Sequence, residues 1–341
     1  MKTILQRLSD RESLTEAEMK EAMDNLFAHD VTDSEIAAFM VSLKTKGETV
    51  EEIAGIVKAM RDKSLSFRKK IPNVLDNCGT GGDGSCSFNI SSTSAFVIAG
   101  AGIPVAKHGN RSVSSKTGSA DVLEHLGINL NHPPERTEEI LEEIGIAFLF
   151  APHVHPNIKR IMKVRKDLRI PTTFNLIGPL TNPVELDNQL LGIYRRDYIE
   201  MFAEVLRALG RKRAVVLNGA GFMDEASLQG ENHLAILQNG IVTKKVLHPE
   251  EVGLSVCSND EIKGGDSREN AEILLSVLKG EKGARRDTVL LNAGIGIFTG
   301  GRAETIQEGI HLAKESIDSG AALQKLHQLI EASKSVQKEV I

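Results

Sequence analysis

The sequence changes character at one stretch, Asn73-Val74-Leu75-Asp76-Asn77-Cys78-Gly79-Thr80-Gly81-Gly82-Asp83-Gly84. A short apolar run that leads directly into a glycine-rich loop is typical of a strand in an α/β sheet, and this strand should end near Cys78. Four glycines between Gly79 and Gly84 let backbone N–H groups converge on an anion, so we expect phosphate to bind there. A flexible surface turn is the alternative interpretation.

Further short apolar runs follow and alternate with amphipathic helical patterns. This alternation predicts an α/β domain with a mainly parallel central sheet flanked by helices. The expected strands are 74–75, 103–106, 146–150 and 214–217. The pair Asn239-Gly240 between two apolar runs predicts an antiparallel hairpin, which would make the sheet mixed. The expected helices include 119–126, 137–144, 157–168, 198–209 and 270–278, with two more closing the chain.

The first seventy residues predict a small all-helical domain. They contain three capping boxes, each followed by apolar residues at helical spacing. The paired residues are Thr15 with Glu18, Thr32 with Glu35, and Thr49 with Glu52. A chain of 341 residues favours two domains over one. We therefore expect a helical domain at 1–70, which part of 165–190 would join, and an α/β domain at 73–341.

Composition restricts the class of protein. With 41% hydrophobic residues and no apolar run of bilayer length, the chain should not be a membrane protein. Its first ten residues lack the features of a signal peptide, so a cytoplasmic location is expected. The formal net charge of -5 disfavours nucleic acid as a partner. The cysteines, Cys78, Cys86 and Cys257, lack C-x-x-C spacing and should be reduced thiols.

Cationic and hydroxyl side chains are concentrated in Lys107-His108-Gly109-Asn110-Arg111-Ser112-Val113-Ser114-Ser115-Lys116-Thr117-Gly118-Ser119. This run follows an expected strand, and open α/β sheets bind ligands at the carboxyl ends of their strands. A solvated basic loop is the alternative. Together with the glycine-rich loop, the run would form one pocket for a ligand that carries both a monophosphate and a diphosphate.

Two shorter segments add polar groups near this pocket. Ser87-Phe88-Asn89-Ile90-Ser91-Ser92 precedes a helix through Ala99, where such residues serve as N-caps or, beside a glycine loop, bind anions. Asp224-Glu225 follows an apolar strand and Asn218-Gly219-Ala220-Gly221. Paired acids on a loop are usually just solvated, but magnesium prefers carboxylate and phosphate oxygens. A nearby phosphate pocket makes these acids candidate metal ligands.

Familiar nucleotide-binding and hydrolase motifs do not account for the glycine-rich loop. Its letters fit G-x-G-x-x-G, but that fingerprint opens a helix at once and has an acidic residue about twenty positions later. Here Ser85–Asn89 intervenes, and the next expected strand ends in Lys107. A P-loop is excluded because no Gly-Lys-Ser or Gly-Lys-Thr follows, and the chain has no G-x-S-x-G elbow.

Five segments together resemble the anthranilate phosphoribosyltransferases, which belong to the nucleoside-phosphorylase-like phosphoribosyltransferases. The segments are Gly79–Asp83, Asn89–Ser91, Lys107–Ser119, Phe174-Asn175-Leu176-Ile177-Gly178-Pro179-Leu180-Thr181-Asn182-Pro183, and Asp224-Glu225. They occur in the family's order, and the resemblance covers essentially the whole chain. It implies transfer of the phosphoribosyl group of phosphoribosyl diphosphate (PRPP) to anthranilate in tryptophan biosynthesis, with magnesium (Mg2+). It also implies a homodimer paired through the helical domain.

The resemblance assigns site residues by position. Implied PRPP-binding residues are Gly79, Gly82, Asp83, Ser87, Asn89, Ile90, Ser91, Ser92, Lys107, His108, Gly109, Asn110, Arg111, Ser112, Val113, Ser114, Ser115 and Ser119. Implied anthranilate-binding residues are Gly79, His108, Asn110, Arg165 and Pro179, and implied metal-binding residues are Ser91, Asp224 and Glu225. His108 could orient the anthranilate carboxylate, relay a proton, or serve a structural hydrogen-bonding role.

Four positions depart from the family's pattern. Ser92 stands where threonine is usual, Pro171 alters the stretch before Phe174, and Asn218 and Phe222 replace a histidine and a glycine. Ser92 keeps the hydroxyl, and the others lie beside the implied ligands. Two rival functions stay open from the sequence: a related enzyme with another acceptor, such as a nucleoside phosphorylase, and a non-catalytic relative that binds nucleic acid.

Overall fold

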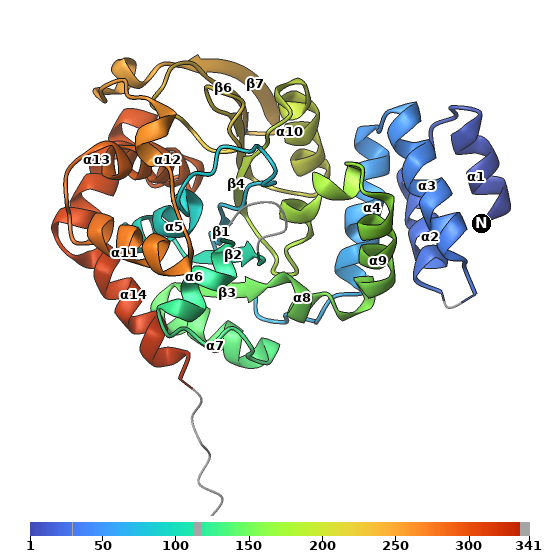
Figure 1. Ribbon diagram of the computed structural model, residues 1–341, viewed down its shortest axis with the longest axis horizontal. Helices are drawn as coiled ribbons and strands as arrows, with labels where there is room; N and C mark the ends of the chain where they lie inside the picture. The colour runs from blue at the N-terminus through green and yellow to red at the C-terminus, as the bar shows by residue number, and fades with distance from the viewer. Residues whose placement is uncertain (29, 112–116, 335–341) are drawn as a thin grey trace, which may run out of the picture.

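The computed structural model describes residues 1–28, 30–111 and 117–334 and shows a helical domain beside an α/β domain (Figure 1). The helical domain contains α1 (Lys2–Ser9), α2 (Glu16–Phe27), α3 (Asp33–Lys46) and α4 (Val50–Asp62), with α9 (Lys159–Leu168) packed on α3. The three predicted capping boxes begin α2, α3 and α4. Helix α1 was not predicted, because its N-cap side chain forms no capping hydrogen bond.

The α/β domain is built on a seven-stranded sheet in the order β3-β2-β1-β4-β5-β6-β7. The strands are β1 (Leu75–Asp76), β2 (Val105–Gly109), β3 (Ile146–Phe150), β4 (Asn188–Gly192), β5 (Arg213–Asn218), β6 (Asn232–Gln238) and β7 (Ile241–Leu247). From β3 to β5 in this order the neighbours pair in parallel, whereas β5, β6 and β7 pair antiparallel. The predicted mixed sheet is thus confirmed. Asn239 and Gly240 both have positive φ, 53° and 75°, as the tight hairpin turn requires.

Nine α-helices outside the helical domain surround the sheet in the described part of the chain. They are α5 (Ile90–Gly100), α6 (Ser119–His125), α7 (Pro134–Ile144), α8 (Ala151–Val154), α10 (Ile199–Ala208), α11 (Ser267–Leu278), α12 (Ala284–Thr299), α13 (Ile306–Asp318) and α14 (Ala321–Ala332). The prediction of two closing helices after 270–278 was wrong, because α12, α13 and α14 follow. Nearly every residue of the second half of α12 is buried between neighbouring helices, so it shows little amphipathic contrast.

Strand β4 was also missed, although it lies at the centre of the sheet. Its first two residues, Asn188 and Gln189, are polar yet buried, which conceals the apolar pattern of a strand. The partners of these side chains lie elsewhere in the chain. The Asn188 side-chain amide donates to Asn73 Oδ1 at 2.7 Å, and the Gln189 side-chain amide donates to the Pro179 carbonyl at 2.7 Å. The cost of burying these amides is therefore offset by hydrogen bonds.

The two faces of the sheet belong to two cores. Along β5, Val215 and Leu217 pack in the core of the α/β domain, whereas Ala214 and Val216 pack in a core shared with the helical domain. Helix α10 covers this face of β5 and β6, and α4 of the helical domain packs on α10. Glu48, between α3 and α4, adds a polar link, because it accepts hydrogen bonds from the hydroxyls of Thr173 and Tyr198.

The parallel strands carry their following loops to one edge of the sheet. The glycine-rich run follows β1, the described residues Asn110 and Arg111 follow β2, residues 193–198 follow β4, and the acidic pair follows β5. Carboxyl ends of parallel strands meet at one edge, so segments far apart in sequence converge there. Among the described residues, no helix has the length and apolar character needed to span a membrane.

Candidate active site at the carboxyl edge of the sheet

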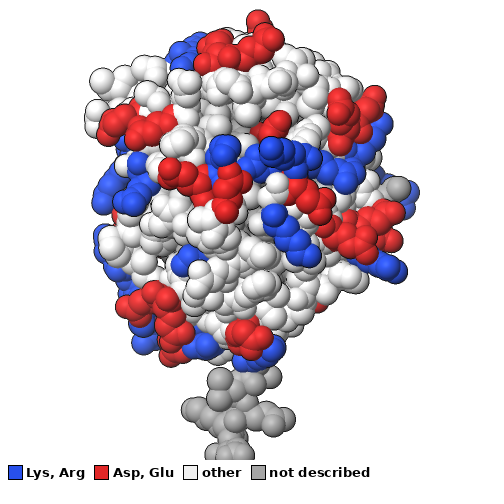
Figure 2. Space-filling model, turned by 90° about the vertical axis from the view of Figure 1, so that its left-hand side faces the viewer, with Lys and Arg blue, Asp and Glu red and all other residues white. Residues whose placement is uncertain are grey.

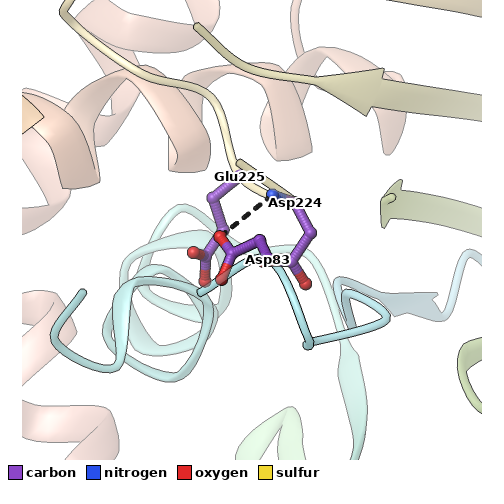
Figure 3. Close-up of side chains that lie close together, drawn as sticks. All are labelled: Asp83, Asp224 and Glu225. Atoms are coloured by element: carbon purple, nitrogen blue, oxygen red, sulfur yellow. Dashed lines mark hydrogen bonds between the residues drawn. The ribbon is translucent and has the colours of Figure 1, made fainter. Parts of the chain in front are cut away.

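Three carboxylates meet where the glycine-rich loop approaches the loop after β5. Oxygens of Asp83, Asp224 and Glu225 lie within 4.8 Å of one another, and their side chains point toward a common space (Figure 3). The Asp224 amide donates to Asp83 Oδ2 at 3.4 Å. Sequence reasoning assigned Ser91, Asp224 and Glu225 to the metal and Asp83 to PRPP.

Glycines allow this close approach. Gly79 forms a parallel bridge with Gly192 at the end of β4, and the Gly81 amide donates to Asp224 Oδ2 at 2.6 Å. A Cβ atom on Gly79 would overlap the Asp224 carboxylate, and one on Gly192 would overlap the Asp224 backbone carbonyl. A side chain at either position would therefore displace Asp224. Gly82, with φ of 80°, faces the ring of Tyr194.

The carboxylates repel one another in a poorly solvated place. Burial, reinforced by the charge of Asp83, raises the pKa of Asp224 to about 7. Burial and the charge of Asp224 raise the pKa of Glu225 as well. None of the ion pairs among the described residues includes Asp83, Asp224 or Glu225. Oxygen ligands that lack a paired side-chain cation fit a hard divalent ion such as Mg2+.

The start of α5 faces this cluster. The Ser91 amide and the Ser87 hydroxyl each donate to Glu225 at 3.4 Å, and the Asn89 side chain accepts a hydrogen bond from Asn270 at 2.9 Å. Ile90 and Ser92 have buried side chains. The Ile90 amide donates to the Phe88 carbonyl at 2.7 Å, and Ser92 Oγ has no hydrogen-bond partner among the described residues.

Buried polar residues line the end of β2. Lys107 Nζ donates to Asn77 Oδ1 at 3.5 Å, and the His108 amide donates to Asp76 Oδ1 at 3.2 Å. Burial raises the pKa of Asp76 to about 6 and lowers that of His108 to about 3, so the His108 ring is neutral near pH 7. Lys107 and Asp76 thus place opposite charges side by side on the neighbouring strands β2 and β1.

His155 was missed by sequence reasoning. Its ring lies 5.4 Å from the ring of His108, edge to face, and burial lowers its pKa to about 4. Within the described part of the chain, His108 Nε2 and both ring nitrogens of His155 have no hydrogen-bond partner. The available signal was its position shortly after β3, at the same edge of the sheet as His108.

The outer part of the Lys107–Ser119 run is partly described. Arg111 forms ion pairs with Asp121 at 2.9 Å and Glu124 at 2.6 Å, and its guanidinium lies 5.4 Å from the ring centroid of Phe150. Ser119 Oγ donates to the carbonyl of Asn110, whose side chain is exposed, at 3.2 Å. Gly109 packs beside Ser119 and Phe148. The predicted ligands Ser112, Val113, Ser114 and Ser115 lie outside the described residues.

The residues expected to contact anthranilate come from several elements. Pro179 is buried in a short 3-10 helix, Gly178–Thr181, and the Gly178 backbone contacts the ring of His108. Arg165 lies half-buried on α9, where Nη1 approaches Met162 Sδ at 3.0 Å. Arg165 forms no ion pair within the described chain, whereas its neighbours Arg160 and Lys163 both pair with Asp33.

Comparisons with known proteins define the class. A family model described as the helical bundle domain of a glycosyl transferase family matches residues 2–64, and the a/b domain of that glycosyl transferase family matches residues 71–323. The fold and site therefore define a two-domain glycosyl transferase of this type.

Individual relatives narrow the class further. The chain is 59% identical to an anthranilate phosphoribosyltransferase of Bacillus mycoides over 98% of both chains. A crystal structure of the enzyme of that name from Thermus thermophilus has a TM-score of 0.93 and 40% identity, covering 97% of this chain and 99% of that one. One from Saccharomyces cerevisiae in complex with PRPP and Mg has a TM-score of 0.88 and 26% identity, covering 97% of each chain. The chain belongs to the anthranilate phosphoribosyltransferase family.

Proposed function

We propose that this chain transfers the phosphoribosyl group of PRPP to anthranilate, giving N-(5-phosphoribosyl)anthranilate and diphosphate in tryptophan biosynthesis. Family membership over the whole chain supports this activity. The observation that carries the proposal is the cluster of Asp83, Asp224 and Glu225 directly beside the glycine-rich loop. Such a cluster suits a magnesium ion that binds together with a diphosphate.

PRPP would be held at the carboxyl edge of the sheet by groups from successive loops. Backbone amides of the glycine-rich loop and of the start of α5 would bind its phosphates, with Lys107 supplying a buried cation. Asp224, Glu225 and the Ser91 hydroxyl would hold Mg2+, and Asp83 lies close enough to join them. When bound, this ion would offset the negative charge of the departing diphosphate.

Catalysis would rest on positioning and electrostatics. The bond between ribose C1 and diphosphate breaks as positive charge develops on the ring, and Lys107 would stabilise the leaving group. The anthranilate amine is already a nucleophile, so no covalent enzyme intermediate is needed. The neutral ring of His108 would accept a hydrogen bond or orient the acceptor, since its low pKa prevents it from acting as a cation at pH 7.

Arg165 is the side chain we propose to bind the anthranilate carboxylate, with Asn110, His108, Pro179 and Gly79 around the acceptor. A guanidinium can form two charge-assisted hydrogen bonds with a carboxylate. The structure supports this choice because Arg165 is half-buried without an ion pair among the described residues, whereas Arg160 and Lys163 are already bound to Asp33.

The decisive experiment mixes the protein with PRPP, Mg2+ and anthranilate and follows the loss of anthranilate fluorescence. Loss should require all three additions. Arg165→Ala should raise the KM for anthranilate by roughly ten- to a hundredfold while leaving PRPP binding nearly unchanged. Lys166→Ala, which removes an exposed neighbouring charge, should have little effect. Equal effects of the two variants would show that the acceptor site lies elsewhere.

The same mixture distinguishes the rival functions. A nucleoside phosphorylase would leave anthranilate unchanged and cleave a nucleoside in the presence of inorganic phosphate. A nucleic-acid-binding relative would be retained on DNA in a salt-dependent manner. On the face shown in Figure 2, acidic and basic side chains of the described residues lie side by side, so this face offers no broad basic patch for such retention.

We further propose that the enzyme is a cytoplasmic homodimer paired through the helical domain at 1–70, with part of 165–190 joining it. Partly exposed apolar side chains on α1 and α3, namely Ile4, Leu5 and Val41, support this interface. The free thiols of Cys78, Cys86 and Cys257 suit a reducing compartment. The α/β domain at 73–341 would then remain free to bind substrates.

A further inference from the structure

One side chain, Arg196, contacts the turn that precedes the acidic pair at three points. Arg196 lies in the loop after β4, in the 3-10 helix Arg196–Tyr198. Its Nε donates to Asn218 Oδ1 at 2.9 Å, its Nη2 donates to the Gly219 carbonyl at 3.4 Å, and its guanidinium carbon lies 4.7 Å from the ring centroid of Phe222. A single planar group therefore touches both ends of the segment 218–222.

The backbone of this segment is strained at Phe222. Its φ of 62° lies in the left-handed region, which a bulky side chain rarely adopts. Phe222 is also 59% exposed, so burial contributes little to holding it there. Such a conformation persists when surrounding contacts impose it, and the stack with Arg196 is a contact of this kind.

The segment is coupled directly to the acids. The Gly219 backbone amide donates to the Met223 carbonyl at 2.9 Å. Asn218 Nδ2 donates to the same carbonyl at 3.2 Å and to the Ile193 carbonyl at 2.8 Å. Met223 immediately precedes Asp224 and is buried. A shift of the turn would therefore be transmitted to Asp224 and Glu225.

The loop that carries Arg196 also supports the glycine-rich loop. The Tyr194 amide donates to Thr80 Oγ1 at 3.4 Å, and the Tyr194 ring lies opposite Gly82. The Thr80 amide in turn donates to the Gly192 carbonyl at 2.9 Å. One short segment, 192–196, is thus in contact with both loops that contribute carboxylates to the cluster.

From these contacts we propose that Arg196 is a positioning residue. It holds the 218–222 turn in its strained conformation and thereby places Asp224 and Glu225 for Mg2+ and diphosphate. The inference rests on the proposed function, because it assigns a purpose to the position of those acids. Asn218 and Phe222, which depart from the family's pattern, are both direct partners of Arg196.

Arg195 provides a matched control. Like Arg196, it lies in the loop after β4, stacks on an aromatic ring and is partly exposed. Its partners differ, because its guanidinium lies 4.3 Å from the ring centroid of Tyr198 and forms an ion pair with Asp197 at 2.5 Å. Replacing either arginine by alanine removes one positive charge and one stack. Only Arg196→Ala removes the contacts with the turn.

The experiment compares Arg196→Ala, Arg196→Lys and Arg195→Ala with the unmodified protein by two measurements. In the ligand-free protein, amide hydrogen exchange of residues 218–225 should be faster in Arg196→Ala than in Arg195→Ala or the unmodified protein. In the activity assay, Arg196→Ala should raise the Mg2+ concentration for half-maximal rate by roughly three- to tenfold, while the KM for anthranilate stays unchanged. For Arg196→Lys, both measured values should lie between those of Arg196→Ala and the unmodified protein. Lysine keeps the positive charge over the Phe222 ring but lacks the planar guanidinium.

Two results would overturn the proposal. One is hydrogen exchange and magnesium dependence in Arg196→Ala that match those of Arg195→Ala. The other is an Arg196→Ala effect that falls equally on anthranilate and Mg2+, which would indicate a general structural role. Failure of the proposed function would look different, because the unmodified protein would then consume no anthranilate while the exchange measurement still tested Arg196.

Discussion

Asp224 shows most clearly how this site destabilises the folded protein and why a bound cation would compensate. It is buried, it accepts a hydrogen bond from the Gly81 amide, and it lies beside two other carboxylates. Burial and the charge of Asp83 raise its pKa to about 7, which means that the ionised form is unfavourable in the folded protein without a cation. Such a residue destabilises the fold unless a ligand compensates, and this is characteristic of functional sites.

The first prediction therefore concerns the acidic pair. The double variant Asp224→Asn/Glu225→Gln keeps side-chain volume but removes two charges that repel each other. We expect a folded protein with a metal-free Tm no lower than that of the unmodified chain. Its turnover should fall by at least about a hundredfold and recover partly at high Mg2+. Steady-state rates across a magnesium titration, with thermal unfolding in a chelator, provide the measurement.

Glu231→Gln is the control, because Glu231 is an exposed acid in the same loop. It should leave both rate and magnesium dependence unchanged. A double variant that turns over at the normal rate at every magnesium concentration would remove the metal assignment.

At the scale of the element, the glycine-rich loop brings its backbone into close contact with Asp224. Gly79 lies against the Asp224 carboxylate, and Gly81 donates its amide to the same group. In contrast, Gly84 has open space around its Cα, although its φ of 74° also favours glycine. The two kinds of glycine should respond differently to substitution, since one is limited by contact with the site and the other by its own backbone.

Alanine at Gly79 tests this distinction. The added methyl group should displace Asp224 and lower kcat/KM for PRPP by about tenfold or more. Gly84→Ala should cost stability, about 1 kcal/mol from the left-handed backbone, while activity persists. Rates with varied PRPP and denaturant unfolding separate the two effects. If Gly79→Ala behaves like Gly84→Ala, the close contact with Asp224 is not the reason that position 79 requires glycine.

At the scale of the whole molecule, the helical domain and the α/β domain share a hydrophobic core. Ala214 and Val216 of β5 share a core with α2, α3 and α4, and Glu48 accepts hydrogen bonds from Thr173 and Tyr198. Arg165, which is proposed to bind the anthranilate carboxylate, lies on α9, and α9 packs on α3. Changes at the helical surface can therefore reach the proposed anthranilate site through α9.

The prediction at this scale is that Val41→Glu dissociates the proposed homodimer. Val41 is a partly exposed apolar residue on α3, and a charge there would be buried without a partner if this face forms the interface. Sedimentation velocity at several concentrations should show a dimer for the unmodified chain and a monomer for the variant. Val246→Glu places the same charge at an exposed valine of edge strand β7 and should leave the dimer intact. A monomeric unmodified chain, or identical behaviour of the two variants, would refute this interface.

The sequence by itself determined features that depend on residues close together in the chain. Thr15, Thr32 and Thr49 each bond a glutamate three positions on, so their helix starts were predictable. The hairpin at Asn239-Gly240 followed from the backbone freedom of those two residues. The glycine-rich loop after β1 and the Asp224-Glu225 pair were likewise visible, because residue type and spacing alone indicate where an anion or a hard cation binds.

Only the tertiary structure decided which of these local features act together. Asp83 and Asp224 are 141 positions apart, yet the parallel strands bring them into one cluster. His155 joins His108 in the same way, across neighbouring strands β3 and β2. Strand β4 and helix α12 escaped prediction because their burial depends on partners supplied by distant segments. The physical reason is common to all four: burial and charge interaction act through space, and proximity in space is set by the completed fold.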